Sequence, residues 1–418
     1  MSCKKFLGAA SAALTIVIAF TLVLAPAAGA ASKYKVLRAF NGSDGSTPYA
    51  GLIFDAAGNL YGTTVGGGVD INGNVFKLTP NADGSWAENV LHTFNGSDGA
   101  EPFAGLVFDA AGNLYGTTGS GGADNFGTVF KLTPNADGRW TESVLYSFNN
   151  RDGRGPYAEL IFDAAGNLYG TTAFGGNLTS SVCIGYGCGV VFKLTPNTDG
   201  SWTERVLHTF NGSDGAEPIA GLIFDTAGNL YGMTDDGGDL SACGGYGCGV
   251  VFKLTPNADG RWTESVLHSF NNRDGANPYA GLIFDAVGNL YGTTQGGAYG
   301  NGTVFKLTPK TDGSWTESVL HSFSIDLGVP LAALIFDGAG NLYGTASSGG
   351  PADGGAAFKL SPNQDGSWAY SLLHVFQGDP ALAPYSGLVF GSAGTLYGST
   401  AYCSSSSGCA GVIYQITP

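Results

Sequence analysis

The segment Asn59-Leu60-Tyr61-Gly62-Thr63-Thr64 decides the fold, because it returns along the chain with few changes. Its tyrosine recurs at Tyr115, Tyr169, Tyr231, Tyr291, Tyr343 and Tyr397. Successive tyrosines lie between 52 and 62 residues apart. Self-similarity at such a period is typical of a repeat architecture in which each copy is one supersecondary unit. The chain therefore holds seven copies, which differ in length mainly by insertions, and insertions belong in loops.

Each copy contains four short runs that are rich in β-branched and aromatic residues, which favour strands. In the first copy these runs are Gly51–Asp55, Leu60–Thr64, Val75–Thr79 and Trp86–Phe94. Turn-forming Gly, Asn and Asp separate the runs, so each copy is predicted to be a four-stranded antiparallel meander. Seven meanders that stack radially cover one another's faces. The sequence therefore predicts an all-β fold, a seven-bladed β-propeller.

The two ends of the repeat array complement each other. A tryptophan heads the fourth strand in six copies, at Trp86, Trp140, Trp202, Trp262, Trp315 and Trp368. The seventh copy ends after its third strand, at Pro418. A lone segment before the first copy, Val36–Phe40, matches the end of a fourth strand, Val90–Phe94. We predict that this N-terminal strand completes the last blade and closes the ring, because closure leaves no open sheet edge.

The N-terminus predicts export. Two lysines precede the apolar run Phe6–Ala25, and Ala28-Gly29-Ala30 fits a small-x-small cleavage site, so residues 1–30 are interpreted as a signal peptide. The run is also long enough to span a bilayer, so an uncleaved N-terminal anchor is the alternative. We expect a single propeller domain over 31–418, with blades near 51–94, 105–148, 159–210, 221–270, 281–323, 333–376, and 387–418 plus 35–40.

The charge of the chain restricts its partners. Without residues 1–30 it carries 16 basic and 33 acidic residues, a formal net charge of −17. Such a surface repels nucleic acid and anionic lipid, so we expect no nucleic-acid partner and no membrane partner after cleavage. We expect a monomer that is secreted or held in the periplasm or cell envelope, with a glycan, peptide or protein ligand.

The cysteines form close pairs. Six remain after residue 30, as Cys183/Cys188, Cys243/Cys248 and Cys403/Cys409. Each pair lies in a connection between the second and third strands. In an exported protein such pairs predict disulfides. Zinc is the alternative, although no histidine lies near them in the sequence. Each bond would close only about six residues, so each pair would constrain a single loop and would not hold the ring together.

The histidines share one repeat position, at His92, His208, His268, His321 and His374. Arg38 and Tyr146 fill this slot in the other copies, so a structural role is predicted over general-base catalysis. No cofactor is evident in the sequence. Calcium stays an open alternative, because Asp70, Asn72 and Asn74 alternate in the first copy, although the glycine and distal glutamate of a calcium loop are absent.

The variable connections predict which face of the propeller binds a ligand. In a meander the fourth-to-first and second-to-third connections share one face, and they contain all of the length variation. Inserted loops on one face of a repeat array are usually its binding side. A near-ring of aromatic residues lies beside the innermost strands on this side, at Tyr49, Phe103, Tyr157, Tyr279 and Tyr385. These rings could stack on a flat ligand; the alternative is that they fill the blade interfaces.

Two departures from the repeat add candidate binding residues. Glu159 occupies a slot that holds Gly or Ala in the six other copies, and we expect its side chain at the channel mouth, near Tyr157. Asp235 and Asp236 occur in the fourth copy only. The Glu159 carboxylate could accept hydrogen bonds from ligand hydroxyls, or join Asp235 or Asp236 around a cation.

The repeat resembles the GloVer-type tandem repeat of secreted bacterial proteins. The shared elements are Leu-Tyr-Gly-Thr-Thr, Gly-Gly, Val-Phe-Lys-Leu-Thr-Pro and Asp-Gly-x-Trp. The resemblance implies export and propeller-like repeats, often followed by a C-terminal sorting anchor, and implies no biochemical role. We expect no such anchor here, because the sequence ends at Ile416–Pro418 inside the last blade.

These observations predict a function class without naming a ligand. The sequence contains no grouping of Ser, His and Asp that departs from the repeat. We therefore predict a secreted, non-enzymatic binding or interaction module that presents variable loops on one face. One alternative is an extracellular enzyme, a lyase, lactonase or glycan hydrolase, with its site at the channel mouth, by analogy of fold. Two facing carboxylates would favour that alternative. The other alternative is a structural envelope protein.

Overall fold

The computed structural model describes residues 32–180, 182–298, 300–324, 326, 328–350, 353–377, 381–403 and 408–418. The expected signal peptide, and the anchor that is its alternative, lie outside these residues. Ser32–Pro418 form one compact unit. Within the described part of the chain, no helix is long and apolar enough to cross a membrane.

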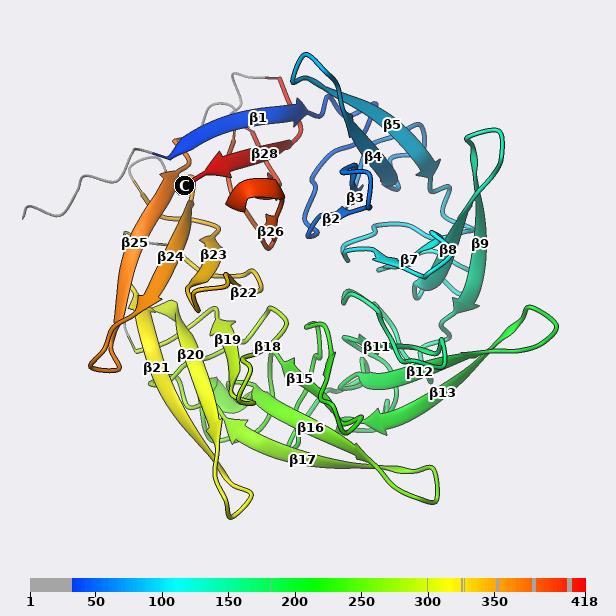
Figure 1. The fold of residues 1–418 in the computed structure, drawn as a ribbon. Helices are drawn as coiled ribbons and strands as arrows, with labels where there is room; N and C mark the ends of the chain where they lie inside the picture. Colours follow the sequence, from blue (N-terminus) through cyan, green and yellow to red (C-terminus); the bar gives the residue numbers. More distant parts are fainter. Residues whose placement is uncertain are drawn as a thin grey trace, which may run out of the picture. The chain divides into compact units, whose positions relative to one another are not determined.

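The compact unit is a seven-bladed β-propeller of four-stranded antiparallel sheets (Figure 1), as predicted. The innermost strands are β2 (Ile53–Phe54), β6 (Val107–Phe108), β10 (Ile161–Phe162), β14 (Ile223–Phe224), β18 (Ile283–Phe284), β22 (Ile335–Phe336) and β26 (Val389–Phe390). The second strands are β3 (Leu60–Thr64), β7 (Leu114–Thr118), β11 (Leu168–Thr172), β15 (Leu230–Thr234), β19 (Leu290–Thr294), β23 (Leu342–Ala346) and β27 (Leu396–Thr400).

The outer two strands of each blade are longer. The third strands are β4 (Asn74–Pro80), β8 (Thr128–Pro134), β12 (Val190–Pro196), β16 (Val250–Pro256), β20 (Asn301–Pro309), β24 (Ala356–Pro362) and β28 (Val412–Thr417). The outermost strands are β5 (Trp86–Thr93), β9 (Trp140–Ser147), β13 (Trp202–Thr209), β17 (Trp262–Ser269), β21 (Trp315–Phe323), β25 (Trp368–Val375) and the N-terminal β1 (Lys33–Ala39).

The ring closes through its two ends, which confirms the predicted closure. β1 pairs with β28 in antiparallel register, from Lys33 opposite Thr417 to Ala39 opposite Val412. The last sheet therefore has the order β1-β28-β27-β26. Figure 1 shows β1 lying along the outside of β28. Neither end of the repeat array leaves an unpaired strand, which protects the sheet edges from association.

The innermost strands are shorter than predicted. In the first blade only Ile53 and Phe54 pair with β3, although Gly51–Asp55 was expected. Asp55 starts a turn instead, because its Oδ1 accepts hydrogen bonds from the Ala57 and Asn59 backbone N–H groups, each at 2.9 Å. The residues before Ile53 face the central channel, where no further strand lies beside them.

Aromatic contacts hold neighbouring blades together. At each of the seven interfaces, a ring at the end of an outermost strand packs on a ring of the next blade's third strand: Phe40 on Phe76, Phe94 on Phe130, Phe148 on Phe192, Phe210 on Phe252, Phe270 on Phe305, Phe323 on Phe358 and Phe376 on Tyr414. The glycine of the repeat makes this packing possible, because a Cβ at Gly62 would lie 2.7 Å from Phe76 Cζ.

Candidate functional site

Two sets of connections share one face of the propeller, which we call the loop face. Isolated β-bridges join the fourth-to-first connection to the second-to-third connection, for example Ser46 with Gly66 and Ala100 with Ser120. The tight turns occupy the opposite face, the turn face. All of the length variation therefore lies on the loop face, as the meander topology requires.

Aromatic side chains from five blades surround the channel mouth on the loop face. A cavity of about 150 Å³ is lined by Tyr49, Phe103, Tyr157, Ile219, Tyr279 and Tyr385. Ring centroids are 4.7 Å apart for Tyr49 and Tyr385, and 5.2 Å apart for Phe103 and Tyr157. We call the five aromatic residues the aromatic rim. They contact one another, as interface packing would require, and they also leave an open cavity.

Glu159 lies in the channel below the aromatic rim. The channel cavity has a volume of about 410 Å³, and Glu159 is the only carboxylate among the described residues that line it. Its side chain reaches toward the second blade, since a Cβ at Gly105 would lie 2.0 Å from Glu159 Oε1. Within the described chain, no hydrogen bond or ion pair reaches this carboxylate. Water in the channel can contact it, yet protein surrounds it, and this burial raises the pKa of Glu159.

The position of Glu159 differs from the expectation in two respects. It lines the channel rather than the mouth cavity, although the two cavities adjoin and share the rim residues Tyr49, Tyr157, Tyr279 and Tyr385. It also does not join Asp235 or Asp236. A glutamate at the innermost slot points along the wall toward glycine, because Gly51 and Gly105 leave space there that the rim does not.

Asp235 and Asp236 meet a third carboxylate, Glu217, at the edge of the mouth. These three residues, the acidic trio, place one carboxylate oxygen each within 4.8 Å of the others. Asn277 Nδ2 donates to the Asp235 carbonyl and to Asp236 Oδ1, each at 3.1 Å. Burial raises the pKa of Asp235 to about 7, and the charges of Asp236 and Glu217 add to the rise.

The sequence did not reveal Glu217. Its slot, two residues before the rim position, holds Glu, Asn, Thr, Gly, Val or Ala in the seven copies, so nothing marks one glutamate as special. The slot adopts a positive φ, 56° at Glu217 and 53° at Asn277, which turns these side chains over the neighbouring loop. Only the folded arrangement brings that loop, with Asp235 and Asp236, to the same place.

The three predicted disulfides are formed. Cys183–Cys188, Cys243–Cys248 and Cys403–Cys409 have Cα atoms 5.3, 5.4 and 5.7 Å apart. Disulfides form and persist in oxidising compartments, so their presence indicates a location outside the cytoplasm. Sulfurs that are bonded to one another are not free to bind zinc as thiolates. These cysteines therefore form disulfides and not zinc sites.

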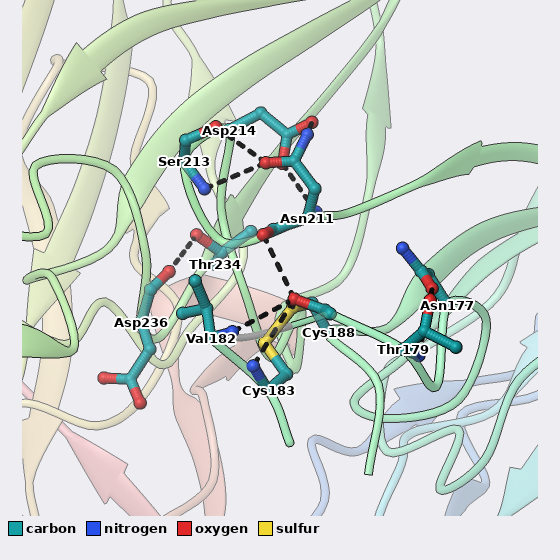
Figure 2. The surroundings of a disulfide bond; sticks show 11 residues. Asn177, Thr179, Val182, Cys183, Cys188, Asn211, Ser213, Asp214, Thr234 and Asp236 are labelled. Atoms are coloured by element: carbon teal, nitrogen blue, oxygen red, sulfur yellow. Dashed lines mark hydrogen bonds between the residues drawn. A yellow bond between two sulfur atoms is a disulfide. The ribbon is translucent and has the colours of Figure 1, made fainter. Parts of the chain in front are cut away.

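The first disulfide secures a loop at the edge of a second cavity. Figure 2 shows the Cys183–Cys188 bond with Val182 and Asn211 beside it. Ser180 Oγ accepts hydrogen bonds from the Val182 and Cys183 backbone N–H groups and donates to the Asn211 carbonyl. The neighbouring cavity, of about 350 Å³, is lined by Val182, Cys183, Ile184, Tyr186, Gly187, Ala216, Glu217, Asp236 and Tyr246. We call it the loop hollow. It adjoins the acidic trio through Glu217 and Asp236.

The histidines lie at blade interfaces, away from both cavities. His92 Nε2 is 3.1 Å from Asp98 Oδ2, and Glu142 of the next blade places an oxygen within 4.8 Å of both. His208 and His268 contact equivalent aspartates at 3.2 and 3.3 Å. Burial raises the pKa of the glutamates at these interfaces to about 7, and the nearby aspartate adds to the rise: Glu88, Glu142, Glu204, Glu264 and Glu317.

The remaining interfaces show that this slot serves the scaffold. Arg38 Nη2 contacts Asp44 and lies 2.6 Å from Glu88 Oε2. Tyr146 donates to Asp152 Oδ2 at 2.6 Å. Where a tyrosine replaces the glutamate, it stacks on the histidine instead: Tyr370 on His321 at 4.3 Å and Tyr34 on His374 at 4.1 Å.

Two residues of the calcium alternative make contacts within the loop face. Asn74 is buried in β4, and its Nδ2 donates to the Asp44 carbonyl at 3.0 Å. The Asn72 carbonyl accepts the Glu101 backbone N–H. Both groups join neighbouring segments of the loop face, and the calcium alternative stays untested.

A further hollow lies on the turn face and follows the repeat. It has a volume of about 670 Å³ between the second and third blades, and its lining includes Asp109, Tyr115, Lys131 and Trp202. Equivalent residues line a hollow between the last and first blades. In six blades the turn aspartate accepts a hydrogen bond from the tyrosine hydroxyl, as Asp109 does from Tyr115 at 3.0 Å. A feature that recurs in this way is part of the scaffold.

The fold and the site define a seven-bladed β-propeller with an aromatic-rimmed channel. The sequence profile of the Gloeobacter/Verrucomicrobia repeat family matches residues 19–244 and 240–418. The chain belongs to this family, which confirms the resemblance seen in its repeat. No curated protein matches the chain at a significant level. Among solved structures, one of a luciferin-regenerating enzyme is similar over 93% of this chain and 95% of its own, at 15% identity and a TM-score of 0.45.

Proposed function

We propose that the protein is a secreted, non-enzymatic binding module whose ligand site is the aromatic rim. The observation that supports this proposal is an open cavity of about 150 Å³ with five aromatic side chains around it. Ligand sites in proteins are commonly concave and aromatic, with a few polar groups that fix orientation. Three residues that depart from the repeat lie near this cavity: Glu159 lines the adjoining channel, and Asp235 and Asp236 belong to the acidic trio, which interacts with the rim tyrosines. The turn face, in contrast, repeats the same network from blade to blade.

The two alternative functions are supported less well than the binding module, and the enzyme alternative would rest on the acidic trio alone. A glycan hydrolase of the usual kind needs two carboxyl groups about 5 to 10 Å apart across the substrate. The channel offers Glu159 alone among its described lining residues, and the acidic trio lies at the edge of the mouth. A purely structural envelope protein would have no reason to keep an aromatic cavity open at its mouth.

Secretion is part of the proposal. The disulfides support a location outside the cytoplasm, and we propose that the signal peptide at residues 1–30 directs export. N-terminal sequencing of protein recovered from outside the cytoplasm tests this step. A mature chain that begins near residue 31 is expected. A protein that keeps residues 1–30 in the membrane would contradict it.

A ligand screen with matched variants tests the binding site. Glycans, peptides and metal ions are screened against the exported protein, and each hit is measured again with Tyr279→Ala and Tyr246→Ala. Tyr279 lines the rim cavity and Tyr246 lines the loop hollow. They are 46% and 66% exposed, so neither substitution opens the core. We expect Tyr279→Ala to weaken binding about tenfold or more, near 1.4 kcal/mol, and Tyr246→Ala to leave it unchanged. Hits that respond to neither variant would place the site elsewhere.

A further inference from the structure

The rim and Glu159 form one continuous site along the channel axis. The mouth cavity and the channel share the rim tyrosines, and Glu159 follows Tyr157 by two residues. Its carboxylate is directed toward Gly105, which follows the rim residue Phe103 by two residues. A ligand that is held by the rim rings therefore lies at the mouth of the same channel whose wall carries the carboxylate.

The charges around this site are mostly negative. Within the channel, Glu159 is the only charged group among the described lining residues, and the four rim tyrosines are the only other groups that titrate. At the mouth, Glu101, Glu217 and Arg154 act on Tyr157, and Asp235 acts on Tyr279. Arg154 is already engaged, because its guanidinium lies 5.4 Å over the Phe126 ring and 6.0 Å over the Phe174 ring.

This combination of groups is suited to a cation. The faces of aromatic rings carry partial negative charge, and aromatic cages recognise quaternary ammonium groups for that reason. Among the residues that the structure describes, none pairs with the Glu159 carboxylate, so a cationic ligand would supply the opposite charge. A cavity of about 150 Å³ accepts a group of roughly the size of benzene. A neutral sugar could stack on the rim, but it would leave Glu159 without a counter-charge.

We propose that the aromatic rim and Glu159 bind an organic cation, with its quaternary ammonium or protonated amine group inside the rim and facing the carboxylate. This inference rests on the proposed function and adds the charge and chemical class of the ligand. It also predicts a linked proton. A permanent cation binds the ionised carboxylate better than the protonated one, so its affinity rises as pH rises and Glu159 loses its proton.

The test compares choline with its uncharged isostere 3,3-dimethyl-1-butanol. Binding to the exported protein is measured by isothermal titration calorimetry from about pH 5 to about pH 8. We expect choline to bind about tenfold or more tightly than the isostere, and its affinity to rise with pH. Burial raises the pKa of Tyr49, Tyr157, Tyr279 and Tyr385 further, so the rim hydroxyls keep their protons in this range.

Two variants separate Glu159 from its acidic neighbours. Glu159→Gln should weaken choline binding about tenfold or more and remove its pH dependence. Asp235→Asn should keep most of that pH dependence, although Asp235 also titrates near pH 7. Glu159→Gly, which restores the repeat, provides a second variant that should fold normally. Its melting temperature controls for misfolding.

The outcomes distinguish this inference from the proposed function. Equal affinity for choline and its isostere, or full choline affinity in Glu159→Gln, would overturn the inference. A neutral ligand that binds at the rim, as shown by its sensitivity to Tyr279→Ala, while choline does not bind would also overturn it and leave the binding module intact. If no ligand responds to the rim substitution, the proposed function fails as well.

Discussion

Glu159 fits the channel wall because two glycines lie opposite its carboxylate. Most of the innermost slots are glycine, and a Cβ at Gly51 or Gly105 would approach Glu159 Oε1 to 3.4 or 2.0 Å. Leaving a carboxylate in a protein interior without a partner costs free energy, and such a group tends to take up a proton instead. Channel water reaches Glu159 and lowers this cost, so its exception to the repeat makes it a candidate for ligand binding that the variants below test.

Gly105→Ala tests whether the position of this carboxylate matters. The new methyl group would meet the far end of the Glu159 side chain, which can rotate away, so we expect little change in melting temperature. We expect ligand affinity at the rim to fall, because the carboxylate leaves its place. Gly281→Ala is the matched control, since its Cβ would come no closer than 3.7 Å to any atom. Equal affinities in the two variants would show that the displaced carboxylate is not used.

The residue scale also shows which parts of the site could be predicted from the sequence. The aromatic rim was found because its members share one offset from the repeat, and a constant offset places them at the same height in every blade. Glu159 was found as an exception to a slot. The direction of its side chain could not be foreseen, because it depends on empty space at Gly105, in a neighbouring blade. Glu217 was missed because its slot varies from copy to copy.

At the scale of strands and loops, the disulfides shape the binding face rather than the ring. Each bond closes about six residues, so its loss should cost on the order of 2 kcal/mol. We expect the double variant Cys243→Ser, Cys248→Ser to keep its far-ultraviolet circular dichroism and its affinity at the rim. Ligands that depend on the loop hollow should bind more weakly. Loss of the β-sheet spectrum would show that the disulfide is needed for the ring and not only for the loops.

The stability of the folded protein depends on pH through glutamates on the outermost strands. The interface glutamates have a pKa near 7 in the folded protein, above the ordinary value of 4.5. The folded state therefore binds more protons than the unfolded state between these values, and stability falls as pH rises through about 7. The turn aspartates act in the opposite sense, because their hydrogen bonds hold their pKa below the ordinary value, although burial opposes this effect. Their contribution is lost only in stronger acid.

Urea unfolding across pH measures this balance. We expect stability to decline from about pH 5 to about pH 7, since five glutamates lose their protons over that range. Burial lowers the pKa of His92, His321 and His374, and this opposes part of the decline. Glu142→Gln should flatten part of the decline, because the amide keeps the shape without titrating. Glu101→Gln, at an exposed position, is the control and should leave the profile unchanged. Stability that rises steadily from pH 5 to pH 8 would show that these interfaces do not hold protonated glutamates.

At the scale of the whole molecule, the strand count and the closure could be predicted because every copy keeps the same order of strands and turns. The last copy lacks a fourth strand, and one extra strand precedes the first copy. The extra strand can therefore only complete the last blade. The shortening of the innermost strands could not be predicted, because the residues before each of them line a channel that no single copy contains. The same limit applies to the interfaces, where Phe94 meets Phe130 of another blade.

Removing β1 tests the closure directly. Deletion of residues 1–40 would expose the edge of β28 and break the pairing that joins the last blade to the first. We expect melting many degrees lower, or aggregation. A chain that lacks only residues 1–31 keeps β1 and is the control. Equal melting temperatures for the two chains would show that β1 contributes little to the ring.

The pairing of β1 with β28 also determines how the propeller responds to force. Lys33 lies opposite Thr417, so both ends of the folded unit leave the sheet at the same corner. Pulling these ends apart would load the hydrogen bonds one after another, as in unzipping, instead of shearing them together. A ring that resists heat through its closure would therefore open under modest tension between its ends. Attachment through one end alone would leave the closure unloaded.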